Sequence, residues 1–158
     1  MNINELLIPA ARIGETEVLE ELINQKADLN HRDEKGYNAL IIACYNNQLD
    51  AARMLIDAGA DVNASDYGGN TALMGASFKG YADIVKLLVD SGADLDLQHG
   101  NGGTALMFAA MFGRNEILDF LLRSGARADI EDKNGQTAIE LAALQGNEAG
   151  MALFKTKG

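Results

Sequence analysis

The stretch "NTALMGASFKGYADIVKLLVDSGADLD", residues 70–96, contains two short helical segments of different character. The apolar residues of "IVKLLV" (84–89) recur at spacings of three and four, the pattern of a helix with one buried face. The segment at 72–79 is rich in alanine, and Thr71 before it can cap the first turn through its side-chain oxygen. Gly92 can then supply a left-handed stop. The stretch therefore predicts two packed helices joined by a short turn.

This pattern returns every 33 residues along the chain. The register is kept by Gly36, Gly69, Gly102 and Gly135; by Leu40, Leu73, Leu106 and Ile139; by Ala43, Ala76, Ala109 and Ala142; and by Asn47, Gly80, Gly113 and Gly146. It predicts a single domain of about five units, at 1–32, 33–65, 66–98, 99–131 and 132–158, with the first and last as caps. Because one helix pair buries too small a core to be stable alone, stability must come from stacking.

The recurring landmarks resemble those of the ankyrin-repeat family over essentially the whole chain. Aspartates lead three of the turns (Asp33, Asp66 and Asp132), "GxTAL" follows, and "GAD" corners close the units. The family's proline is replaced by Ala39, Ala72, Ala105 and Ala138, and its histidine by Ile41, Met74, Met107 and Glu140. The resemblance implies an all-α solenoid of stacked helix-turn-helix units with hairpin-like loops. We expect His99, which leads the fourth turn, to change that turn in detail.

Both ends of the chain depart from the repeat. Pro9 is expected to bend or delay the first helix. Lys26 stands where later units have glycine, and a left-handed conformation there would cost about 1 kcal/mol. The last unit replaces the Ile-Val pair with Gly150-Met151, which predicts a weaker and wetter outer helix, as suits a cap.

Composition narrows the classes of partner and the cellular locations that we expect for the protein. The 158 residues carry 23 acidic and 13 basic side chains, a net charge of −10, with no run of Lys or Arg. A phosphate backbone would be repelled, so we expect no nucleic acid partner. Cys44 is the single cysteine, and the N-terminal apolar stretch is too short for a signal peptide or a membrane span. We expect a soluble, cytoplasmic protein, although export without a cleavable signal would leave the same sequence.

No pattern in the sequence points to catalysis, a cofactor or a metal. The glycine-rich "HGNGGT" (99–104) lacks the lysine and spacing of a phosphate-binding loop, and the repeat explains its glycines as turn residues. His31 and His99 lie in different loops, and Cys44 occupies a small-residue position inside a helix, where an inert buried thiol is expected. A small metal-dependent enzyme is the least favoured alternative. It would need a site such as His99, Asp66 and Asp96 closing around an ion.

The resemblance implies where a partner would bind. In the family, the two positions after the alanine pair of the first helix face a concave groove, with the hairpin tips beside them. The first position is Arg12, Tyr45, Phe78, Met111 and Leu144, the second is Ile13, Asn46, Lys79, Phe112 and Gln145, and the tips are Glu34, Lys35, Tyr37, Tyr67, Asn70, Asn101, Lys133, Asn134 and Gln136. The bulky residues predict an apolar centre with a polar rim, the usual anatomy of a binding hot spot.

The sequence thus favours a monomeric, non-catalytic module that binds another protein with a neutral or basic surface. An inhibitor or immunity-type protein that blocks a partner enzyme shares every one of these features and stays as the alternative. The bulky row could also serve only to pack neighbouring units against each other.

Overall fold

The computed structural model describes residues 2–156, which form ten α-helices in five consecutive pairs and no named strand. The helices are α1 (Ile3–Ile13), α2 (Thr16–Asn24), α3 (Ala39–Tyr45), α4 (Leu49–Asp57), α5 (Ala72–Lys79), α6 (Ala82–Asp90), α7 (Ala105–Met111), α8 (Asn115–Arg123), α9 (Ala138–Leu144) and α10 (Glu148–Thr156). The prediction of an all-α repeat solenoid is confirmed.

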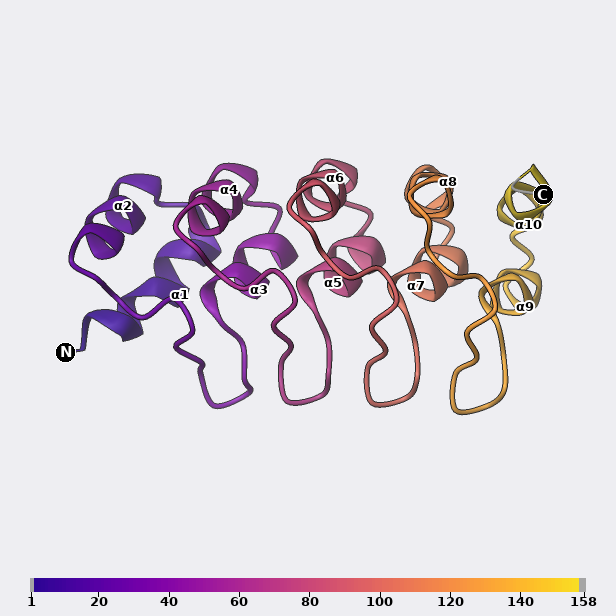
Figure 1. The fold of residues 1–158 in the computed structure, drawn as a ribbon, viewed down its shortest axis with the longest axis horizontal. Coiled ribbons are helices and arrows are strands. Elements are labelled where there is room, and N and C mark those ends of the chain that lie inside the picture. The colour runs from indigo at the N-terminus through magenta and orange to yellow at the C-terminus, as the bar shows by residue number, and fades with distance from the viewer. Residues whose placement is uncertain (1, 157–158) are drawn as a thin grey trace.

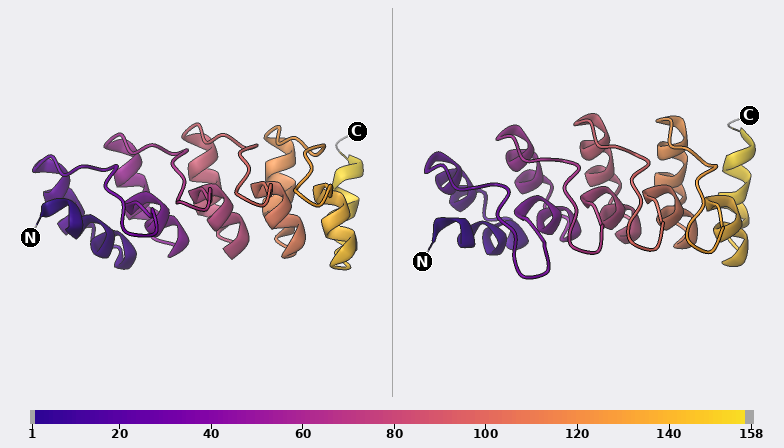
Figure 2. Two further views of the ribbon diagram at one scale, coloured as in Figure 1. Left: turned by 90° about the horizontal axis from the view of Figure 1, so that it is seen from below. Right: turned by 60° about the horizontal axis from the view of Figure 1, so that its bottom comes forward.

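The helices form two rows, as Figure 1 shows. The odd-numbered helices make an inner row, the even-numbered helices make an outer row, and the loops between units hang from the opposite side of the inner row. Two further views confirm that the pairs stack in chain order from the N-terminus to the C-terminus (Figure 2). Each inner helix therefore contacts the inner helices of the units before and after it.

The inner helices begin where polar side chains cap them. The side chains of Asn38, Thr71 and Thr104 accept the backbone N–H three residues on, at 2.8, 3.2 and 3.3 Å. These caps are buried, so each satisfies a backbone donor that water does not reach. The replacement of proline by alanine after the cap leaves this start of the helix intact.

The core runs unbroken through the stack. Leu40, Leu73 and Leu106 of the inner helices and Leu55, Leu88 and Leu121 of the outer helices are almost completely buried. Alanines at 43, 76 and 109 have no exposed surface, and their small size lets neighbouring inner helices approach closely.

The loops are hairpin-like and joined to one another. In three of them the leading aspartate accepts the backbone N–H groups two and four residues on, an Asx turn that fixes the loop. Each following loop donates one backbone N–H to the loop before it: Tyr67 to Lys35, Gly100 to Gly68 and Lys133 to Asn101, at 2.9 to 3.2 Å. Gly69 has a φ of +84°, and a Cβ there would lie 3.1 Å from the Cα of His99. Glycine is required at this position by both conformation and contact.

The His99 turn differs from the others only in its side chain. Its backbone makes the same two bonds as the Asp66 turn, but the imidazole Nδ1 accepts a single N–H, from Gly103 at 2.9 Å. The expected change in detail is therefore the loss of one of the two side-chain bonds.

At the ends of the stack, the expected delay of the first helix does not occur, whereas Lys26 does adopt the left-handed conformation. The first helix is not delayed by Pro9, because the side chain of Asn2 accepts the N–H of Asn4 and starts the helix at Ile3, with Pro9 inside it. Lys26 is left-handed, with a φ of +64°. The outer helix α10 has partly exposed Met151 and Phe154 where earlier outer helices have buried residues.

Candidate functional site

A cavity of about 330 Å³ opens between the inner helices α3 and α5 and the hairpins beside them. We call it the Gly75 hollow. Its lining residues are Tyr37, Ile41, Ile42, Tyr45, Asp66, Asn70, Thr71, Ala72, Met74, Gly75, Phe78 and Phe108. Most of this wall is aliphatic or aromatic, and its polar groups come from the hairpin end. This is the usual composition of a site that binds an apolar group in a fixed orientation.

Gly75 creates the space in this hollow. Its repeat position holds Ile42 in the unit before it and Phe108 and Leu141 in the units after it. A Cβ at Gly75 would lie 3.0 Å from Cδ1 of Tyr45, so the tyrosine ring occupies part of the room that a side chain would need. Glycine inside a helix is about 1 kcal/mol less favourable than alanine. The helix thus tolerates a local loss of stability where the wall of the stack is hollowed.

A second cavity, of about 450 Å³, lies one unit further along. We call it the His99 hollow. It is lined by His99, Asn101, Gly103, Met107, Phe108, Met111, Asp132, Lys133, Asn134 and Leu141. Phe108 belongs to both hollows and separates them. The His99 hollow takes a larger share of its wall from polar hairpin residues than the Gly75 hollow does.

Aromatic rings connect the two hollows. Phe78 meets Phe112 edge to face, with ring centroids 4.7 Å apart, and meets Phe108 at 6.4 Å. Phe108 also contacts the ring of His99 at 5.2 Å. Such edge contacts contribute about 0.5–1.5 kcal/mol each beyond the area that they bury. They hold the rings in fixed positions along the inner row.

A cation borders these rings. The Nζ atom of Lys79 lies 5.0 Å from the ring centroid of Tyr45, within the range of a cation–π interaction. A similar contact places the guanidinium of Arg32 5.9 Å from the ring of Tyr67 at the hairpin tips. Lysine and arginine therefore lie at the edges of the aromatic surface.

The structure brings some of the predicted partner-binding residues together. Tyr37, Tyr45, Asn70 and Phe78 line the Gly75 hollow, whereas Asn101, Met111, Lys133 and Asn134 line the His99 hollow. Lys79 and Phe112 join them through their contacts with Tyr45 and Phe78. None of the predicted residues is buried.

The remaining predicted residues lie outside the two hollows. Arg12 and Ile13 are in the first unit and Leu144 and Gln145 are in the last, so they border the ends of the row; Asn46, Tyr67, Glu34, Lys35 and Gln136 are exposed or half-exposed beside it. Ile13 and Leu144 are 63% and 65% exposed. They extend the apolar surface without forming part of a cavity.

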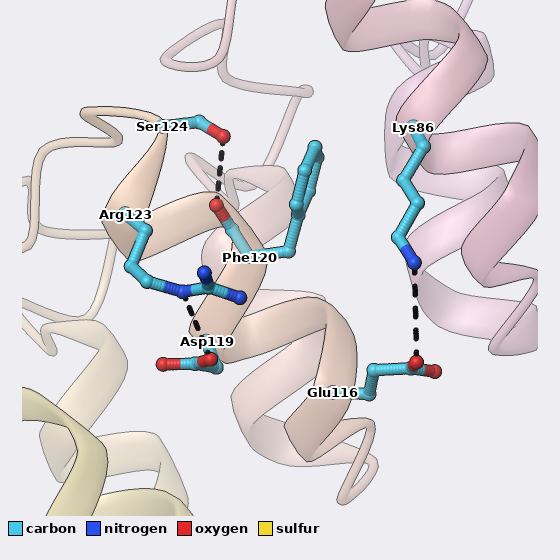
Figure 3. A network of polar contacts seen from close by, with 6 residues as sticks. All are labelled: Lys86, Glu116, Asp119, Phe120, Arg123 and Ser124. Atoms are coloured by element: carbon cyan, nitrogen blue, oxygen red, sulfur yellow. Dashed lines mark hydrogen bonds and ion pairs between the residues drawn. The ribbon is translucent and has the colours of Figure 1, made fainter.

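Charge is unevenly distributed between the two rows. The five inner helices carry two acidic and two basic residues and so no net charge, whereas the five outer helices carry ten acidic and four basic residues. Figure 3 shows part of this outer charge, with Lys86 of α6 reaching Glu116 of α8 and Arg123 paired with Asp119. The acidic excess of the chain thus lies largely away from the inner row.

Asp66 is an acidic residue that does lie beside the inner row, in the wall of the Gly75 hollow. It is only 9% exposed, and it is the one charged residue among those that line the cavity. Its Oδ1 atom accepts the backbone N–H groups of Gly68 and Asn70, both at 2.9 Å. Its Oδ2 atom accepts only the side-chain amide of Asn70, at 3.2 Å. Within residues 2–156 no cation pairs with it.

Other reactive side chains are accounted for by the fold. Burial raises the pKa of the Cys44 thiol to about 12, so it stays protonated at neutral pH. No group of three or more His, Cys, Asp or Glu residues lies close enough to hold a metal ion in the part of the chain that the structure describes. None of the helices described there is long and apolar enough to cross a membrane.

Sequence reasoning missed the Gly75 hollow and several of its walls. The predicted surface does not include Ile41, Ile42, Met74, Gly75 or Phe108, all of which line the hollow. One signal was available, because Gly75 interrupts a repeat position that holds Ile, Phe and Leu in other units. The depth of the hollow also depends on where the rings of Tyr45 and Phe108 lie, which the repeat pattern does not specify.

Comparison with known proteins identifies the repeat. A family model described as ankyrin repeats (3 copies) matches residues 6–99 and again 73–157. The two matches overlap and together span nearly the whole chain. A search of curated proteins found no match.

Proposed function

Because the chain belongs to the ankyrin-repeat family, whose repeats generally act as protein–protein interaction modules, we propose that it binds another protein through its inner row and hairpin tips. In this proposal the protein is non-catalytic. Tyr45, Phe78, Met111 and Phe112 form the apolar centre of the binding surface, and Lys79 and Arg12 lie at its rim.

The observation that carries the proposal is the row of half-exposed rings on three adjacent units. Tyr45 and Phe112 remain 42% and 45% exposed although Tyr45 contacts Lys79 and Phe112 contacts Phe78. Contiguous apolar surface of this kind is seldom left unused on a monomeric protein. Aromatic residues ringed by polar side chains are also the commonest energetic centres of interfaces.

The alternative that the rings serve only to pack neighbouring units against each other explains the row less well. The edge-to-face contact of Phe78 with Phe112 does stabilise the stack, but burial would serve that purpose better than half-exposure. The rings are held by their neighbours before any partner arrives. Little side-chain entropy would then be lost on docking, which favours affinity.

The charge distribution supports a partner with a neutral, apolar contact region. An acidic partner would be repelled by the net charge of −10, while the helices of the inner row have no net charge to attract a strongly basic one. Basic groups on the partner would be accommodated at the edges, near Asp66 and the hairpin acids.

The proposal is tested by quantitative affinity capture from a lysate of the source organism. The bait is the wild-type chain or a Tyr45→Ser, Phe78→Ser, Phe112→Ser variant whose helix content is verified by circular dichroism. We expect a protein captured by the wild type to be lost with the variant. The row would then be the binding surface.

A matched control variant carries Leu6→Ser and Val18→Ser, which remove two exposed apolar residues from the first unit, away from the row. It should capture the same protein as the wild type. If the row variant also captures that protein unchanged, the row does not bind it and the proposal fails.

A further inference from the structure

We propose that the Gly75 hollow is a specificity pocket that takes one large apolar side chain from a partner peptide, with a lysine or arginine beside that side chain reaching Asp66. This inference rests on the proposed function and adds the chemistry of the partner segment. The pocket differs from the rest of the stack, because glycine stands at position 75 where the neighbouring units have Ile42 and Phe108.

The size of the hollow fits one bulky side chain. A closed apolar cavity of about 150 Å³ is enough to hold benzene. The hollow has about 330 Å³ and is open to solvent at one side, so an aromatic ring or a leucine can enter together with part of its backbone. The wall presents the rings of Tyr45, Phe78 and Phe108, which favour edge contacts with an aromatic guest.

The wall also excludes a charged guest from the deep end. Ile41, Ile42 and Met74 supply no hydrogen-bonding side-chain group of use to a buried charge. A lysine or arginine would therefore leave its charge unpaired at that end. The side chain that enters must be apolar.

The hairpin end of the hollow is polar and can accept a positively charged group. The Oδ2 atom of Asp66 accepts one bond, at 3.2 Å, and a carboxylate oxygen has room for a second donor. No cation of residues 2–156 pairs with this carboxylate. A lysine or arginine of the partner would supply the missing donor and charge together, which is a charge-assisted bond of the stronger kind. The complement of the pocket is thus an apolar residue next to a basic one.

The experiment is a selection from a random-peptide phage library against the full wild-type chain. Enriched peptides should pair a large apolar residue with Lys or Arg at a neighbouring position. The best peptide is then synthesised, and its affinity is measured by fluorescence polarisation for the wild type and three variants. An enriched set without that pairing would overturn the inference.

Gly75→Phe fills the pocket with the residue that the next unit has at this position. It should weaken peptide binding by about thirtyfold, as expected for the loss of a hot-spot contact. Since Phe108 is accepted at the same position of α7, the fold should persist, and thermal unfolding checks this. Gly75→Ala fills less of the space and should weaken binding less. Unchanged affinity in a folded Gly75→Phe variant would show that the peptide binds elsewhere.

Asp66→Asn tests the basic residue. Asparagine keeps an Oδ1 acceptor for the turn and removes the charge, so binding should fall about tenfold while the fold is retained. Asp132→Asn makes the same change in a turn that does not line the hollow and should leave affinity unchanged. Equal effects of the two substitutions would overturn the role of Asp66.

The inference and the proposed function can fail separately. If Gly75→Phe leaves binding of the captured protein intact while the Tyr45, Phe78 and Phe112 variant abolishes it, the row binds the partner but the pocket does not select it. If neither variant changes capture, both ideas are wrong.

Discussion

The Gly75 hollow and the His99 hollow are built on the same repeat, one unit apart, and yet they present different chemistry. The first is deepened by the absence of a side chain on α5, and its one charged residue is Asp66. The second is bordered by the polar hairpin residues Asn101, Lys133 and Asn134, and its turn is led by His99. Phe108 forms a wall of each. A single repeat register can thus produce an apolar pocket and a polar one by changes in the hairpin residues and in the middle of the inner helix.

The buried core residues behind the two hollows should contribute equally to the free energy of unfolding, although the surfaces of the hollows differ. Leu73 lies behind the Gly75 hollow and Leu106 behind the His99 hollow, and both are almost completely buried. Leu73→Ala and Leu106→Ala should each lower the free energy of unfolding by about 3 kcal/mol, the sum of lost burial and the cavity left behind. Urea denaturation measures this. If one substitution cost less than half as much as the other, the two units would not share an equivalent core.

The two leading turn residues should differ in their contribution to stability. Asp66 holds two backbone N–H groups and the side-chain amide of Asn70, whereas His99 holds one N–H. Asp66→Ala should cost about 2 kcal/mol because it strands donors in a partly buried turn. His99→Ala should cost about 1 kcal/mol, from one hydrogen bond and the ring contact with Phe108.

Thermal or urea unfolding measures the free energy of unfolding of both turn variants, and the difference between the two values tests this expectation. His99→Asp sharpens it further, since an aspartate in the same backbone turn can accept a second N–H, from Asn101. A His99→Ala variant that is less stable than Asp66→Ala would mean that the ring contact with Phe108, not the turn bond, dominates at this position.

Substitution of Gly75, in the middle of α5, should stabilise the protein, whereas the substitutions above should destabilise it. Gly75→Ala should raise the free energy of unfolding by about 0.5–1 kcal/mol, because alanine favours the helix and restricts the unfolded chain. The added Cβ requires Tyr45 to shift by a few tenths of an ångström, which its exposed ring can do. Differential scanning calorimetry should show a higher melting temperature. If Gly75→Ala instead destabilises the protein, the tyrosine ring is held too firmly to move.

Gly80→Ala is the matched control. Gly80 ends the same helix with a φ of +85°, a conformation that disfavours alanine, so this substitution should lower stability by about 1 kcal/mol. The same exchange at two positions of α5 therefore separates a glycine kept for backbone conformation from a glycine that leaves space.

The sequence predicted the fold because its signals are local and repeated. Caps such as Thr71, small residues such as Ala76 and stops such as Gly92 act within one unit, and their recurrence makes each prediction reinforce the others. It also placed Tyr45, Phe78 and Phe112 on one surface. The hollows were not predicted, because they depend on ring positions in neighbouring units. The same is true of the hydrogen bonds between hairpins, such as the one that the N–H of Gly100 donates to the carbonyl of Gly68.

The smallest expected effect concerns the far wall of the His99 hollow, where Leu141 is preceded by Glu140. The carboxylate of Glu140 accepts the backbone N–H of Thr137 at 2.9 Å and its hydroxyl at 3.0 Å, so these bonds lower the pKa of Glu140 below the ordinary 4.5. A group whose pKa is lower in the folded state stabilises it above the unfolded-state pKa and loses that contribution as the pH falls through the folded-state pKa. The wild type should therefore lose slightly more stability than Glu140→Gln between about pH 5 and pH 3. In the third unit the sulfur of Met74 accepts the corresponding N–H, from Thr71 at 3.5 Å, and it carries no charge to titrate, so acid should loosen the last unit before the third. Backbone amide exchange followed by NMR at several pH values would show which unit opens first, and earlier opening of α5 than of α9 would contradict the expectation.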